Sequence, residues 1–245
     1  MSQAQIALNP SVGLQPAEPP APSLFKFFFS PTAFFQSLDV RTVWVKAFLI
    51  CSGLTVATIL ISLPLISHAS AAQLGQLPVD RQQELLSTMR ASQYVAILFS
   101  PVMQLLKLVI GAYVLWGLTV LSGADIQYRK LLSLLSYASI VPILDRLWGY
   151  SLNYLAGVDK IETGADIRST LLSLSAFFDF SSHPALRSLV DNCDLMSFWY
   201  FVVLVSGLAI LGKMSRMKST VIVFAFFFAQ LAFAVGTNLL FVKGS

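Results

Sequence analysis

The sequence alternates between long apolar stretches and short polar ones over most of its length. A helix that crosses the hydrocarbon core of a bilayer needs about 20 mostly apolar residues. Five stretches meet or approach this length, and we expect each to span a membrane: 43–66, 94–121, 131–150, 195–212 and 220–241. The apolar stretch at 169–180 is too short to cross, so the pattern predicts five crossings rather than six.

Two segments precede the first crossing. Residues 1–22 are rich in Pro, Ala and Gln, a composition that cannot bury a core, so we expect a disordered tail. Residues 23–42 mix six phenylalanines with polar residues, and Pro31 after Ser30 predicts the start of a short helix. We expect this segment to be amphipathic and interfacial, with its aromatic side chains at the level of the lipid headgroups. A transmembrane domain at 43–241 and a short tail at 242–245 complete the chain.

One polar segment has helical character of its own. The sequence PVDRQQELLSTMRAS at 78–92 opens with Pro-Val-Asp and continues with good helix formers. It predicts a short surface helix between the first and second crossings.

The composition fits a chain whose main solvent is lipid. Hydrophobic residues make up 56% of the 245 residues and charged residues 11%, whereas a soluble domain carries about 25% charged residues. The formal net charge is +4, but the basic residues are scattered and form no basic stripe, which argues against nucleic acid as a partner. We therefore expect an all-α, polytopic helical bundle in the lipid bilayer.

The basic residues beside the crossings predict the orientation. They are dense in the N-terminal segment and in the two shortest loops: Lys26, Arg41, Lys46, Arg129, Lys130, Lys213, Arg216 and Lys218. In the longer loops on the other side of the membrane they are spread out. Because short loops dense in Lys and Arg remain in the cytoplasm, we expect a cytoplasmic N-terminus and a C-terminus outside.

The sequence contains no motif of a known catalytic site. HExxH, GxSxG, CxxC and a glycine-rich phosphate loop are all absent, and neither histidine has a nearby cysteine. We therefore expect no enzyme, no catalytic residue, no cofactor and no metal site.

Three charged residues interrupt apolar stretches and are the candidate functional residues: Lys107, Asp145 and Arg146. A charge in the middle of a spanning helix costs about 2.5–3.5 kcal/mol, so it normally faces the bundle and finds a partner. Counted from the cytoplasmic ends of their stretches, Lys107 and Asp145 both lie about 21 Å into the membrane. The sequence predicts an intramembrane ion pair between them, with Arg146 extending toward the outer headgroups.

Two interpretations of this pair stay open. It either fixes the register of two antiparallel helices or lines a polar path for a proton or a small solute. The same stretch contains Pro142, which lacks an amide proton and predicts a kink in the helix.

The last crossing carries small residues at a helical spacing. Ala225, Ala229, Ala232 and Gly236 fall on one narrow face at 3.6 residues per turn. Such a seam allows another helix to approach closely in lipid. The approaching helix belongs either to the same chain or to a second copy, and the oligomeric state stays open.

Two segments together resemble the bacterial Yip-domain family, which is related to the eukaryotic Ypt/Rab-interacting membrane proteins. LFKFFFSPTAFFQSL at 24–38 resembles the aromatic Ser-Pro entry of that family, and GADIQYRKLLSLLSYASIVPIL at 123–144 resembles its loop after the second crossing. The predicted five crossings match as well. The resemblance covers residues 24–241.

The resemblance implies a non-enzymatic membrane scaffold or interaction protein, here of a bacterial inner membrane. Eukaryotic relatives would bind small GTPases and act in vesicle traffic or membrane shaping. For a bacterial member, the resemblance suggests other membrane proteins as partners, such as components of ABC-type export complexes. The alternative from the residues themselves is a small transporter or an accessory permease subunit, with Lys107 and Asp145 lining a polar path.

Overall fold

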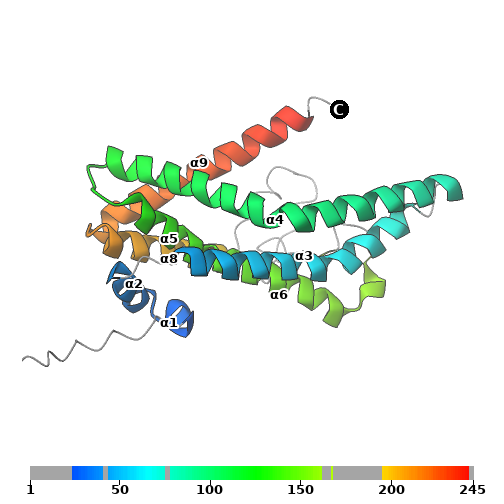
Figure 1. Cartoon of the computed structure of the whole chain (residues 1–245), viewed down its shortest axis with the longest axis horizontal. Helices are drawn as coiled ribbons and strands as arrows, with labels where there is room; N and C mark the ends of the chain where they lie inside the picture. Colours follow the sequence, from blue (N-terminus) through cyan, green and yellow to red (C-terminus); the bar gives the residue numbers. More distant parts are fainter. Residues whose placement is uncertain (1–23, 41–43, 75–77, 162–166, 168–194, 243–245) are drawn as a thin grey trace, which may run out of the picture.

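The structure, a computed structural model, describes residues 24–40, 44–74, 78–161, 167 and 195–242, and in the last helix it describes side chains as far as residue 230. This part of the chain is all-helical and contains no strand (Figure 1). Its helices are α1 (Leu24–Phe29), α2 (Pro31–Val40), α3 (Trp44–Leu74), α4 (Val79–Leu121), α5 (Tyr128–Ala138), α6 (Ile140–Ala156), the 3-10 turn η1 (Val158–Lys160), α8 (Leu195–Leu211) and α9 (Arg216–Val242). Apart from Val242, the predicted tails at 1–22 and 242–245 lie outside the described residues.

Three helical stretches within the described residues are long and apolar enough to cross a membrane. They are Trp44–Ala72, Asp80–Leu121 and Tyr128–Ala156, and they contain most of the first three predicted crossings. The predicted crossing at 195–212 forms α8, a shorter apolar helix of 17 residues, and the one at 220–241 lies within α9. The all-helical class is confirmed, and the number of crossings remains a prediction.

The second crossing is part of an unusually long helix. α4 has 43 residues, which corresponds to about 64 Å at 1.5 Å per residue, roughly twice the thickness of a hydrocarbon core. The prediction of a separate surface helix at 78–92 is wrong, because no glycine separates that segment from the crossing and the helix continues through it. Even Pro101 does not end α4. The Ser100 hydroxyl donates to the carbonyl of Ile97 (2.9 Å), which lacks its usual donor because proline has no amide proton.

The third span is broken at Ser139. Pro142 cannot donate to the carbonyl of Ala138, so the regular helical ladder is interrupted one turn before it. α5 accordingly ends at Ala138 and α6 begins at Ile140, which confirms the predicted kink.

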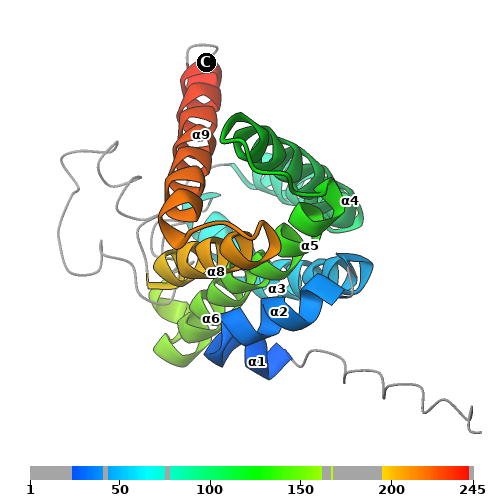
Figure 2. The ribbon, with the colours of Figure 1, turned by 90° about the vertical axis from the view of Figure 1, so that its left-hand side faces the viewer.

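Helix α5 lies at the centre of the bundle. Its residues 131–138 are all buried, and it packs against α3, α4 and α8. α6 packs along α3, and α9 packs on α8 and α4. The end view in Figure 2 shows α5 between α4, α3 and α8.

Helices α1 and α2 form a short hairpin that packs against the bundle at α8 (Figure 1). Phe27, Phe34 and Phe35 are fully buried, and the Phe34 ring meets Tyr137 of α5 edge to face with centroids 4.9 Å apart. The prediction that the aromatic side chains lie among headgroups is wrong for these three. Burial against α5 and α8 removes the rings from both lipid and water, which an isolated interfacial helix does not achieve.

The two short basic loops lie at the same end of the bundle (Figure 1). Residues 122–127 join α4 to α5, and 212–215 join α8 to α9. α4 ends here because Gly123 adopts a φ of +73°, a left-handed conformation that favours glycine. Ile126 of the first loop packs beside Gly212 of the second, since a Cβ at Gly212 would lie 3.0 Å from its Cδ1. The first loop leads to Arg129 and Lys130 at the start of α5, and the second contains Lys213 and leads to Arg216 of α9, so the basic residues beside both loops lie at one end of the bundle.

Candidate functional site

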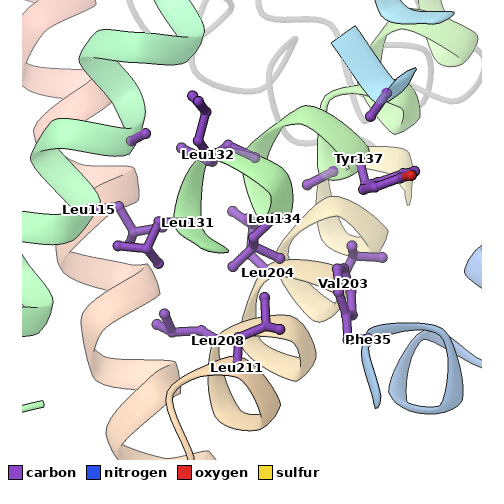
Figure 3. Close-up of a cluster of buried hydrophobic side chains, with 14 of the residues drawn as sticks. Phe35, Leu115, Leu131, Leu132, Leu134, Tyr137, Val203, Leu204, Leu208 and Leu211 are labelled. Carbon is purple, nitrogen blue, oxygen red and sulfur yellow. The ribbon is translucent and has the colours of Figure 1, made fainter. Parts of the chain in front are cut away.

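The centre of the bundle is filled by apolar side chains. Figure 3 shows Leu131 and Leu134 of α5 among side chains from the neighbouring helices, including Leu204 and Leu208 of α8. These side chains belong to one hydrophobic cluster that extends from Phe27 in α1 to Phe226 in α9. The middle of the described bundle is thus a packed core.

Gly207 allows α8 to approach α5 closely. A Cβ at this position would clash with the Leu134 side chain and would lie 3.0 Å from the Phe35 ring. Three elements therefore meet at one glycine, as small residues permit at helix contacts in lipid. The sequence analysis did not single out Gly207, because one glycine in an apolar run carries no spacing signal.

Two side-chain hydrogen bonds connect α5 to its neighbours. The buried Cys51 thiol of α3 donates to the carbonyl of Ser136 (3.1 Å), and the Tyr128 hydroxyl donates to the carbonyl of Val109 in α4 (3.1 Å). Both bonds use main-chain carbonyls as acceptors, so they hold helices in register without requiring a particular side chain on the other helix. Sequence reasoning missed them for that reason.

Helix α6 carries a buried polar stripe. Asp145, Gly149 and Asn153 are spaced four residues apart, share one helix face and are all buried. Asp145 is 3% exposed and makes a polar interaction within the structure. The Asn153 amide donates to the carbonyl of Gly149 (3.0 Å). The stripe places a carboxyl group and an amide inside the protein, where polar groups need partners.

A further hydrogen bond joins α6 to the part of α3 that contains Pro64. The Tyr154 hydroxyl donates to the carbonyl of Ile61 (2.7 Å), which lies in the turn before Pro64. A proline crowds the preceding turn and weakens its backbone bonding, and a donor from a neighbouring helix compensates in lipid. This contact links the two helices over 93 residues of sequence.

The structure does not bring Lys107 and Asp145 together. Lys107 is exposed on α4, whereas Asp145 is buried on α6, and no ion pair joins them in the described part of the chain. The predicted pair requires that the two helices joined by residues 122–127 pack along their whole length. Because the third span breaks at Ser139, α5 is the part that packs extensively on α4, while α6 packs mainly on α3 and α8.

Arg146 follows Asp145 but points away from the core. Its side chain is exposed on α6, and so is Trp148, at 59%. Adjacent residues of a helix do not share a face, which accounts for the contrast with Asp145. The predicted extension of Arg146 toward outer headgroups stays a prediction.

The small-residue seam faces outward where its side chains are described. Ala225 and Ala229 are exposed on α9, while the buried side chains Ile222, Val223 and Phe226 make the contact with the bundle. Ala232 and Gly236 lie in the part of α9 whose side chains are outside the description. Within the described residues, Ala225 and Ala229 take no part in the packing of α9 on the bundle, and a second copy remains the open alternative.

The described residues offer no obvious catalytic chemistry. Among them, no group of three His, Cys, Asp or Glu side chains could hold a metal ion. Their buried polar groups bond mostly to backbone carbonyls of their own or neighbouring helices, as Ser136 does to Leu132 (2.7 Å). Such an arrangement stabilises helix contacts.

A family model described as the Yip1 domain matches residues 25–237, from α1 into α9. No curated protein and no solved structure matches the chain.

Proposed function

The chain belongs to the Yip1-domain family and is a membrane protein of that family, and from this premise we propose that it works without catalysis, as a scaffold or interaction protein in the bilayer. Its role is to bind other membrane proteins laterally and to organise them. For a bacterial inner-membrane protein, the partners are proposed to be membrane proteins such as export components of the ABC type, and the N-terminus is proposed to be cytoplasmic.

The observation that carries this proposal is the position of α5. Leu131, Leu134 and Ala138 are each 0% exposed, and residues 131–138 are buried along their whole length. A solute path through the bundle needs polar, hydrated walls, whereas the centre of the described bundle is apolar and packed. The proposal therefore assigns function to the outer surfaces of the helices.

A transporter or an accessory permease subunit is the second candidate. The buried Asp145 and Asn153 favour it, because intramembrane carboxylates often belong to ion or proton pathways. The position of Lys107 argues against a transporter. A polar path lined by Lys107 and Asp145 needs both side chains inside the bundle, and only Asp145 is buried there.

The test is crosslinking and affinity isolation from native membranes, paired with a flux assay. We expect a second membrane protein in a fixed ratio with this chain in mild detergent. Purified protein in sealed vesicles is expected to give no more proton or solute flux than empty vesicles. Flux by the protein alone that Asp145→Ala abolishes would overturn the proposal in favour of the second candidate.

A further inference from the structure

Lys107 lies near the middle of the apolar part of α4. It comes 13 residues after Tyr94 and 14 before Leu121, so about 20 Å of helix separates it from either end. The four-carbon stem of lysine covers only a fraction of that distance. Lys107 therefore differs from a lysine near a helix end, which reaches the headgroups by extending along the helix.

Apart from Gln104, one turn before it, the residues around Lys107 on the surface of α4 are apolar, and most are exposed. We call the surface formed by Met103, Lys107, Ile110 and Val114 the Lys107 face, because these residues follow one another at helical spacing. Met103 is 51% exposed, Ile110 54% and Val114 37%. Of the three helical stretches long enough to cross a membrane, the one in α4 is the least buried: 11% of its most apolar 18-residue segment is buried by the rest of the protein.

Lys107 has no hydrogen bond or ion pair within the described part of the chain. Charged residues at such depth usually meet an opposite charge, because neither lipid tails nor apolar side chains solvate an ammonium group. No described residue of this chain supplies the opposite charge, so a partner molecule is the candidate source.

A second copy of this chain does not meet the requirement. Asp145 is the only carboxyl residue in the five apolar stretches predicted to cross, and it is buried and already engaged in its own bundle. A symmetric contact through α4 would place Lys107 near Lys107, and like charges at an interface oppose association.

We propose that the Lys107 face binds a transmembrane helix of another protein, and that this helix carries an aspartate or glutamate near its middle. The carboxylate pairs with the Lys107 ammonium, and the apolar side chains on either side pack against the partner helix. This inference rests on the proposed interaction role and names the surface and the partner chemistry for it.

The test uses a helix of the stated chemistry as the probe. Full-length protein is reconstituted in phosphatidylcholine vesicles with a fluorescent polyleucine transmembrane peptide that carries one central aspartate. An identical peptide with leucine at that position is the reference. Energy transfer between labelled protein and peptide is expected to show at least tenfold tighter association for the aspartate peptide.

Substitutions in the protein complete the design. Lys107→Met should remove the preference for the aspartate peptide, and Lys107→Arg should keep it, because arginine retains the charge. Arg146→Met is the matched control, since it removes an exposed cation from α6 and should leave the preference unchanged.

Three outcomes would overturn the inference: equal binding of both peptides, a preference that survives Lys107→Met, or self-association of the protein that Lys107→Met abolishes. The last outcome would make a second copy the occupant of this face. These failures are separable from failure of the proposed function, because native complexes recovered through another surface would still support an interaction role.

Discussion

Gly207 is the residue whose substitution tests the core most directly. A Cβ there overlaps with Leu134 and touches Phe35. Overpacking a close contact costs about 1–3 kcal/mol, so Gly207→Ala should lower the free energy of unfolding of the purified protein in detergent by that amount. Gly53→Ala is the matched control, since no atom lies within 4 Å of the added methyl group and alanine favours a helix by up to about 1 kcal/mol. Equal losses from both substitutions would show that α8 does not approach α5 as described.

Lys107 and Asp145 are predicted to act independently, since one is exposed on α4 and the other is buried on α6. Asp145→Ala removes the polar interaction of a buried carboxyl group and should destabilise the protein. Thermal unfolding of the two single variants and the double variant should give additive changes, within about 0.5 kcal/mol. A coupling energy of about 1 kcal/mol or more between the two substitutions would support the ion pair that the sequence predicts and contradict their independence.

At the scale of elements, the hydrogen bond from Tyr154 to Ile61 shows how α6 supports α3 in the turn before Pro64. Tyr154→Phe should cost about 0.6 kcal/mol, and no more than about 1.7, which is the range for hydrogen bonds between helices in lipid. In a Pro64→Ala background the loss should shrink, because alanine supplies the amide that the Leu60 carbonyl lacks and removes the ring that crowds the turn containing Ile61. If Tyr154→Phe lowers the free energy of unfolding in detergent equally with and without the Pro64→Ala change, the hydrogen bond does not compensate for the proline.

The helices themselves follow from the sequence more reliably than their contacts do. The stretch at 94–121 is helical because lipid requires satisfied backbone groups, and Pro142 marks the break because it lacks a donor. The partners of each helix do not follow, since one break at Ser139 was enough to direct α6 away from α4. The phenylalanines of α1 and α2 illustrate the same limit, because an amphipathic aromatic pattern suits a headgroup layer and packing against α8 equally well.

At the scale of the whole molecule, the arrangement predicts which loops share a side of the membrane. Single cysteines at Asp125 and Ser215 should both react with a membrane-impermeant thiol reagent from the cytoplasmic side, and a cysteine at Gln83 from the opposite side. All three positions are exposed, and the native Cys51 is buried, so it should contribute little background. Cys193 is replaced by serine in this assay. Labelling of all three positions from one side would refute the orientation.

We propose that the protein acts through lateral contacts with other membrane proteins. The most direct measurement places a photocrosslinking residue at Ile110 on the Lys107 face, in the full-length protein in its native membrane, with Leu49 on α3 as an exposed reference position. We expect Ile110 to give a discrete protein adduct whose mass exceeds that of the chain by one other membrane protein, and Leu49 to give mainly lipid adducts. Lipid adducts alone from Ile110, together with solute flux by the purified protein, would contradict the proposal.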